Sequence, residues 1–389
     1  MRVVAKFQFT APSEGEAVSS RIAAILEKWS DRKFIKTPDG GVVIRHSGAS
    51  ATFDKTSDQI EDRQRNTFTI LEAVEGGNLQ TDVDVISGAG RTAFRCVLSV
   101  GSDGGIAPTG VSLRSPRFVR DIVALGEPWT IGASGERIFA HSFPIDVDDV
   151  PDLEALMVAT QRRLPIVIVS ELLGETLAGD LHERVSQDLC GLAHTVRLSA
   201  EASWELTRSR GKEWSCYNGA VRLLWPFRAN GDDFRMHPLW TLDQMMSRAD
   251  NEVQARDHIR GVIAGRIIEA STFVADDPAF RDFDVAKVRK AADQARATAT
   301  DGGDMGALAD SYAAENDALR LRVDEQDNEI EVLRQNVETL TIALRSSQAA
   351  KVELSSEAPP QTVEEAVNLA RRDLGDKVPI ASEPNRKLG

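Results

Sequence analysis

The chain is poor in cysteine. Its 389 residues include only Cys96, Cys190 and Cys216, and no two of them stand at the C-x-x-C spacing of a zinc or redox site. So few cysteines in so long a chain do not make a disulfide framework, which is typical of proteins from a reducing compartment. The sequence therefore predicts no disulfides, no thiolate metal site and a cytoplasmic location.

Long apolar runs are missing as well. Residues 1–16, MRVVAKFQFTAPSEGE, hold too short an apolar stretch for a signal peptide. No other stretch approaches the roughly 20 apolar residues that a membrane helix needs. We therefore expect no association with membranes.

Basic residues are outnumbered, because 46 Lys and Arg stand against 60 Asp and Glu, which gives a formal net charge of −14. Generic binding to nucleic acid or to anionic membranes needs the opposite balance, so nucleic acid is not an expected partner. Hydrophobic residues make up 42% of the chain and charged residues 27%, which is typical of a folded globular protein. The length allows two or three domains.

Catalytic motifs are missing too. The sequence contains no GxxxxGK[ST], no GxGxxG after a strand, no HExxH and no GxSxG. We therefore expect no cofactor and no metal, and the chain is more simply interpreted as a protein without enzymatic activity. One acidic cluster, at Asp146, Asp148 and Asp149, leaves open a metal site, but acidic residues also favour the start of a helix.

Residues 1–110 are predicted to form an α+β domain. Val3–Phe9 alternates apolar and polar residues like a strand, and a helix is expected to end near Trp29. Three further strands are separated by Gly-rich turns, which favours an antiparallel meander: Thr67–Val74, Leu79–Ser87 and Thr92–Gly101. Residues 111–135 are a predicted connector.

Residues 136–245 are predicted to form a Rossmann-like, three-layer α/β domain with a mostly parallel sheet. Leu164–Ser170 (LPIVIVS) is a continuous apolar run of strand length, as expected for a parallel strand buried on both faces. Predicted strands and helices alternate around it: Arg137–Phe143, Asp152–Gln161, Asp180–Leu192, His194–Leu198, Glu201–Ser209 and Gly219–Trp225. The predicted fold class is thus multidomain, α/β and α+β, with a long C-terminal coiled coil.

The carboxyl ends of the predicted strands are where an open α/β sheet binds ligands. That rule makes Ser170 and Glu171 the catalytic candidates, although no other residue completes a catalytic set with them and a turn or helix cap is the simpler interpretation of Ser170. His194 begins a strand at the opposite end, where a buried structural histidine is expected. Trp204, Trp214, Trp225 and Trp240 favour a core, but exposed tryptophans would indicate an interface.

The rest of the chain is predicted to be mostly helical, with one linker: a helical region over 246–307, a coiled coil over 308–346, the linker over 347–361, and a C-terminal helix and tail over 362–389. The coiled coil has β-branched residues at most a positions and Leu at most d positions, which favours two parallel strands. The a residues are Asn316, Val323, Ile330, Val337 and Leu344, and the d residues are Tyr312, Leu319, Gln326, Leu333 and Leu340. A single Asn at an a position fixes register.

Flanking charges support the parallel alignment. In a parallel dimer each g residue faces the e residue five places on in the partner, and the three such pairs that are charged at both positions join opposite charges: Glu315 with Arg320, Arg322 with Asp327, and Glu329 with Arg334. One long helix packed on its own chain, or a trimer, is the alternative. The sequence therefore predicts a parallel homodimer.

Two functions fit these patterns. The first is a non-catalytic scaffold or regulatory protein of the bacterial cytoplasm, in which a parallel coiled coil joins α/β domains in pairs and the C-terminal helix contacts a protein partner. The alternative is an enzyme that processes nucleotides or nucleic acids in a prokaryotic defence or mobile-element system, with its site near Ser170 and Glu171. A pocket with several convergent polar groups at the strand ends would favour the enzyme.

Overall fold

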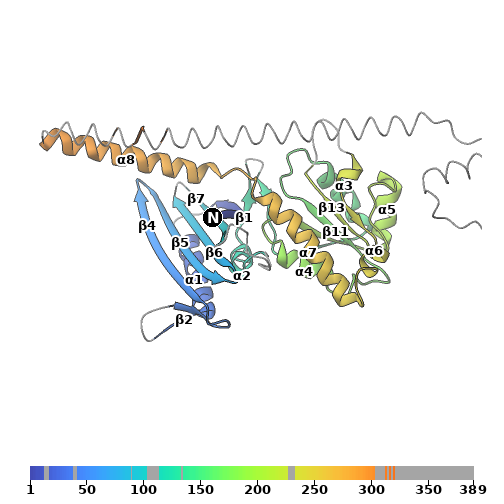
Figure 1. Cartoon of the computed structure of the whole chain (residues 1–389). Helices are drawn as coiled ribbons and strands as arrows, with labels where there is room; N and C mark the ends of the chain where they lie inside the picture. The colour runs from blue at the N-terminus through green and yellow to red at the C-terminus, as the bar shows by residue number, and fades with distance from the viewer. Residues whose placement is uncertain are drawn as a thin grey trace, which may run out of the picture. The chain divides into compact units, whose positions relative to one another are not determined.

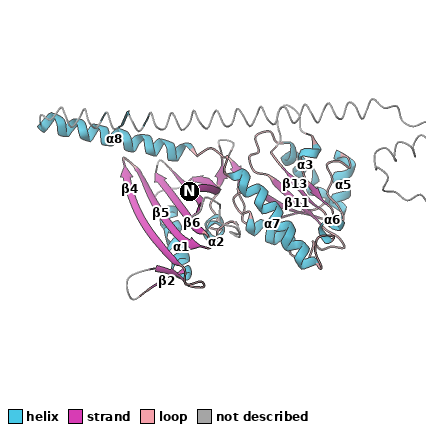
Figure 2. Cartoon of the chain, viewed as in Figure 1, coloured by secondary structure: helices cyan, strands magenta, loops and turns pink. Residues whose placement is uncertain are grey.

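The computed structural model describes residues 1–12, 17–37, 42–88, 90–102, 114–132, 135–226 and 233–302, together with Tyr312, Glu315, Asn316 and Leu319. Contacts within the chain define two units, Met1–Ala292 and Asp293–Gly389. The fold below is that of the first unit (Figures 1 and 2). The predicted linker 347–361 and the segment 362–389 lie outside the described residues, as does the coiled coil apart from the four positions just named.

The N-terminal part is a nine-stranded sheet in the order β2-β3-β4-β5-β6-β7-β1-β8-β9, with every neighbouring pair antiparallel. Strands β3 to β7 follow one another along the chain and across the sheet, so they form a meander. The strands are β1 (Arg2–Pro12), β2 (Phe34–Lys36), β3 (Val42–Ile44), β4 (Ser50–Ile60), β5 (Arg63–Val74), β6 (Gly77–Gly88), β7 (Arg91–Ser102), β8 (Thr130–Ile131) and β9 (Glu136–Arg137).

Helices α1 (Ala17–Lys33) and α2 (Arg117–Val123) cover one face of this sheet. Alternate residues of the strands point to that face, and the buried aromatic rings of Phe7 and Phe9 on β1 pack there with Phe118 of α2. Trp129 is fully buried in the same core, and its Nε1 donates to the carbonyl of Ile122 at 3.0 Å. The strands therefore form because one set of their alternating side chains is apolar.

The other face of the sheet carries both charged residues and a small apolar cluster at Ile60, Ile86 and Ala93, and the first turns of α8 (Pro278–Gly302) pack against it. Asp84 of β6 is buried there and accepts hydrogen bonds from Arg65, Arg95 and Thr67. The guanidinium of Arg95 lies 4.4 Å from the ring centre of Phe280 on α8. Arg65 also pairs with Asp284 of α8 at 2.7 Å, so this ion pair and the aromatic rings of α8 attach the start of the helix to the sheet.

The second sheet has five strands in the order β10-β12-β11-β13-β14. Its strands are β10 (Phe143–Ile145), β11 (Ile166–Ser170), β12 (His194–Leu198), β13 (Val221–Leu224) and β14 (Leu239–Trp240). The 3-10 turns η1 (Val147–Asp149) and η2 (Phe234–Met236) and helix α6 (Leu242–Met246) connect its elements, and Asp146 with Asp149 forms a capping box at the start of η1. The acidic cluster thus begins a helical turn.

Helices cover both faces of this sheet. One face packs against α3 (Val150–Val158) and α5 (Ala200–Arg210), and the other packs against α4 (Leu181–Asp188) and α7 (Glu252–Ser271). The core under α4 and α7 continues into the core of the nine-stranded sheet, and α7 contacts β1 directly. Both sheets therefore belong to the one unit.

The fold class predicted from the sequence is wrong, because this sheet is mixed instead of mostly parallel. Strands β10, β12 and β11 are parallel, but β13 is antiparallel to β11 and β14 is antiparallel to β13. Residues 211–220 return the chain to the carboxyl end of β11, where the N–H of Ser170 donates to the carbonyl of Ala220 at 3.0 Å. Strand β13 therefore starts at that end and runs in the opposite direction.

Candidate functional site

The two catalytic candidates from the sequence lie at the carboxyl end of β11, but on opposite faces of the sheet. Ser170 is fully buried, and its Oγ donates to the carbonyl of Ala220 at 3.0 Å. Glu171 comes next in the chain, and its carboxylate accepts a hydrogen bond from Nε of Arg197 at 2.5 Å. Ser170 thus fastens the start of β13 to β11, and the structure does not bring it together with Glu171.

An open pocket of about 400 Å³ lies beside the edge strand β10, and we call it the β10–α4 pocket. Its polar lining comes from three segments: His141 and Ser142 before β10, His182 and Glu183 with Ser186 on α4, and Arg197 on β12. Pro144 and Arg197 are paired across β10 and β12 and line it together. The parallel strands and α4 thus gather residues that are far apart in the chain, from Ala140 to Arg197.

His182 is the titratable group of this pocket with the most constrained surroundings. Its Nδ1 lies 3.0 Å from Oγ1 of Thr176, within hydrogen-bond distance. Burial lowers the pKa of His182, and the positive charge of Arg197 lowers it further against the opposing effect of nearby carboxylates. The lowered pKa favours the neutral ring at pH 7, and a neutral imidazole can accept or donate a hydrogen bond to a polar ligand.

Arg197 carries a second polar group of the pocket, but its charge is already shared. Besides Glu171, its Nη2 donates to the carbonyl of Gly174 at 3.3 Å. Ser186 is also engaged, because its Oγ donates to the carbonyl of Ala140 at 3.5 Å. The β10–α4 pocket can thus hold a polar ligand, but its arginine brings no uncompensated charge to it.

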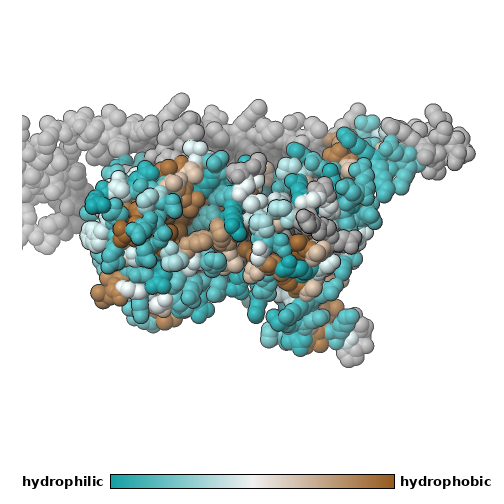
Figure 3. All heavy atoms as spheres, turned by 180° about the vertical axis from the view of Figure 1, so that it is seen from behind, coloured by the Kyte–Doolittle hydropathy of each residue, from teal (hydrophilic) through white to brown (hydrophobic). Residues whose placement is uncertain are grey.

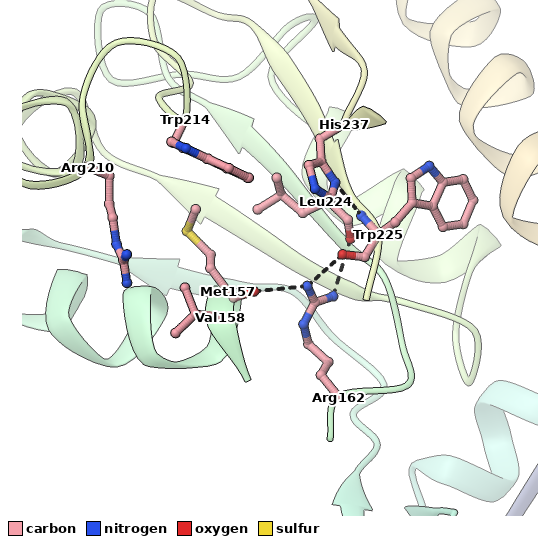
Figure 4. A pocket seen from close by; sticks show the side chains of 8 residues that line it. All are labelled: Met157, Val158, Arg162, Arg210, Trp214, Leu224, Trp225 and His237. Carbon is pink, nitrogen blue, oxygen red and sulfur yellow. Dashed lines mark hydrogen bonds between the residues drawn. The ribbon is translucent and has the colours of Figure 1, made fainter. Parts of the chain in front are cut away.

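A smaller pocket of about 100 Å³ lies on the opposite face, and Figure 4 labels the residues that line it. Arg162 lines this pocket and is buried, and it donates to five backbone carbonyl groups: those of Leu156 at 3.1 Å, Met157 at 3.2 Å, Leu164 at 2.7 Å, Leu224 at 3.3 Å and Trp225 at 2.8 Å. His237 accepts from the N–H of Trp225 at 3.0 Å. This volume falls below the roughly 300 Å³ of typical ligand sites, so these residues hold the fold together.

The three thiols are poor nucleophiles. All three are buried, and burial raises the pKa of Cys190 to about 12 and that of Cys216 to about 11. Burial also raises the pKa of Cys96 far above its usual range. Because the thiolate is the reactive form, none of them suits covalent catalysis near neutral pH.

His194 is a buried structural histidine, which is the interpretation that its sequence position favours. Its Nε2 lies 2.9 Å from Oε1 of Glu136, and the other carboxylate oxygen of Glu136 accepts the N–H of Arg163 at 2.5 Å.

Among the tryptophans, Trp204 is 62% exposed and stacks on Tyr217 with ring centres 6.1 Å apart. The other three are partly buried.

The sequence did not single out His182, Arg197, Arg162 or Arg163. The sequence nevertheless held a signal for Arg162 and Arg163. These arginines stand directly before the buried run of β11, where a charged pair is costly unless it is bonded.

Within the described ranges, no group of three or more His, Cys, Asp or Glu residues could hold a metal ion. Over the same ranges, no helix has the length and apolarity to cross a membrane.

Comparison of the chain with protein-family models, with curated proteins and with solved structures finds no match.

Proposed function

We propose that the chain is a non-catalytic scaffold or regulatory protein that acts as a parallel homodimer. The observation that carries this proposal is the bonding at the carboxyl end of β11, where Ser170 and Glu171 are both committed to other protein groups. The buried, protonated thiols support it as well. Polar groups that stabilise the fold in this way are not free to activate a substrate.

The assembly part of the proposal rests on the heptad pattern of residues 312–346. Tyr312, Asn316 and Leu319 are helical, and Leu319 at a d position is 54% exposed in the single chain. An apolar d residue with that exposure fits a seam that a second chain covers. On the described part of the face in Figure 3, hydrophobic residues form small patches among hydrophilic ones, so that face offers little apolar area for pairing.

The test is the mass of the full chain in solution by multi-angle light scattering. We expect twice the mass of one chain, and the mass of one chain after deletion of residues 308–346. A full chain that stays monomeric, or a deletion variant that stays dimeric, would contradict the proposal. We also expect Asn316→Val to raise the thermal stability of the dimer and to loosen its oligomer specificity, because a buried Asn fixes register at a cost in stability.

A second candidate function is an enzyme that processes nucleotides or nucleic acids, and the β10–α4 pocket favours it. Polar groups from three segments meet there, including the neutral imidazole of His182. The test is product analysis after incubation with nucleoside triphosphates and with oligonucleotides in the presence of Mg²⁺. Turnover that is lost in His182→Ala and Arg197→Ala would favour this candidate over the scaffold. If the unaltered chain gives no product, the scaffold proposal stands.

A further inference from the structure

A third pocket, of about 530 Å³, lies where the two sheets meet, and we call it the junction pocket. Its walls are formed by β1 and β8 of the first sheet, by residues 162–165 before β11, by residues 191–192 before β12, and by the end of α7 with the residues that follow it. The volume lies within the roughly 300–1,000 Å³ of small-molecule sites, which often lie between such structural parts. Its position alone thus suits a small ligand.

The walls of the junction pocket are mostly apolar and well fixed. Ile131, Leu192 and Ile267 contribute aliphatic surface. The segment after α7 is tied to β1, because Nζ of Lys6 donates to the carbonyl of Val274 at 2.7 Å and Oε1 of Gln8 accepts the N–H of Asp277 at 3.2 Å. A preformed apolar wall of this kind lowers the ordering cost of binding an apolar ligand.

Among the described residues that line the pocket, all the charged ones are basic. Its described lining includes Lys6, Arg162 and Arg163 and no Asp or Glu, although acidic residues outnumber basic ones in the chain. Lys6 is neutralised by Asp276 at 2.8 Å, and Arg162 is committed to backbone carbonyls. Arg163 is therefore the cation of the lining that remains for a ligand.

Arg163 is held in place by its backbone and its stem. Its N–H is bonded to Glu136, and its side chain passes so close to Gly132 that a Cβ on that glycine would lie 2.6 Å from Cδ and Nε of Arg163. Gly132 has a φ of +67°, which favours glycine in any case. Within the part of the chain that the structure describes, the guanidinium itself has no hydrogen bond or ion pair. The fold thus presents a cation at the edge of an apolar pocket.

We propose that the junction pocket binds a small amphipathic carboxylate, such as a medium-chain fatty acid, with its apolar body between the sheets and its carboxylate on Arg163. A planar guanidinium pairs with a carboxylate through two parallel hydrogen bonds. One uncommitted guanidinium matches one negative charge, so a monoanion suits the site better than a dianionic phosphate. This proposal concerns a site apart from the coiled coil and does not depend on dimer formation.

The test is isothermal titration calorimetry of the full chain with dodecanoate below its critical micelle concentration. We expect saturable binding of one dodecanoate per chain, weaker binding of dodecanol and no stronger binding of dodecyl phosphate. Arg163→Gln should weaken the binding of dodecanoate by about tenfold or more, because a charge-assisted bidentate pair is lost. The same substitution should leave the affinity for dodecanol unchanged. The affinity of Arg163→Lys for dodecanoate should lie between that of Arg163→Gln and that of the unaltered chain.

The matched control is Arg281→Gln, because the Arg281 side chain is 73% exposed on α8 and lies outside the pocket. This variant should bind dodecanoate like the unaltered chain. Trp225 lines the pocket, so dodecanoate should change the tryptophan fluorescence, and Trp225→Phe should remove most of that change. The absence of saturable binding, or equal affinity of the unaltered chain and Arg163→Gln for dodecanoate, would overturn the proposal. Tighter binding of dodecyl phosphate would overturn the carboxylate assignment.

Discussion

Replacing Arg162 by methionine removes the charged group that joins three segments of the mixed sheet. The guanidinium donates to carbonyls at the end of α3, before β11 and at the end of β13. The two α3 carbonyls belong to the last turn of that helix, where the negative end of the helix dipole favours a cation. The substitution keeps a side chain of similar length, so it tests the hydrogen bonds more than the packing.

The expected loss of stability in Arg162→Met follows from the number and burial of these carbonyls. A hydrogen bond to a charged group contributes about 1.5–3 kcal/mol, and a buried carbonyl left without a partner costs about 1–3 kcal/mol. Removing the buried charge also removes its desolvation cost, which offsets part of the loss. We therefore expect Arg162→Met to lower the free energy of unfolding by about 3 kcal/mol, instead of by the sum over five bonds.

Equilibrium unfolding in urea, followed by tryptophan fluorescence and by circular dichroism, measures this loss. The adjacent Arg163→Met is the matched control: its side chain is exposed, so the expected change is within about 0.5 kcal/mol. The loss of stability in Arg162→Lys should lie between those of Arg162→Met and Arg163→Met, since an ammonium has three donors and lacks the planar fork. If Arg162→Met loses less than about 1 kcal/mol, or no more than Arg163→Met, the guanidinium does not hold the segments together.

Two further predictions concern the first sheet and the turn after β11. Burial raises the pKa of Asp84, but the charges of Arg95 and Arg65 and their hydrogen bonds outweigh it and leave the pKa below its usual value. The stabilisation by Asp84 is thus fully present above the unfolded pKa of about 4 and is lost as the pH falls through the folded pKa. Asp84→Asn should cost about 3 kcal/mol in urea unfolding at pH 7, and a difference from the unaltered chain that does not shrink toward pH 3 would contradict this. Leu173 has a φ of +54° and is 95% exposed, so Leu173→Gly should raise the free energy of unfolding by up to about 1 kcal/mol; a loss of stability would show that the side chain contacts something.

The strands of the first sheet show which elements the sequence could predict. Leu79–Ser87 was predicted within two residues of β6, because Val83 and Val85 alternate with polar residues and point into the core. The 11-residue β4 was missed, because most of its side chains are exposed and its polar sequence lacks a buried alternating set. It is a strand because β5 supplies its backbone hydrogen bonds, and that partner is not visible in the local pattern.

The direction of β13 could not be predicted for a related reason. Strands buried on both faces read as continuous apolar runs whether their neighbours are parallel or antiparallel. Arg222 even interrupts the run, and it is accommodated because its Nε donates to the carbonyl of Ser215 at 2.9 Å within the returning loop. The direction is set by where that loop ends, which depends on packing between distant residues.

The sequence could predict where in the sheet a site can form, but not which residues come together there. The strand-end rule led to Glu171, but its partner Arg197 is 26 residues away in the chain. The junction pocket combines residues from β1 and from the end of α7, which are more than 250 positions apart, as the bond from Lys6 to Val274 shows with a separation of 268. No spacing pattern in the sequence predicts this combination of residues, because only tertiary packing brings them together.

Parallel dimerisation through residues 312–346 is tested most directly by self-cross-linking of single introduced cysteines. The native thiols are buried, so a cysteine introduced at Leu319 or at Leu340 would be the reactive one. In a parallel, in-register coiled coil each d residue faces its own copy. We therefore expect mild oxidation to convert Leu319→Cys and Leu340→Cys, each by itself, into covalent dimers. Cross-linking only when the two variants are mixed would indicate an antiparallel pair, and no cross-linking in any combination would contradict the dimer.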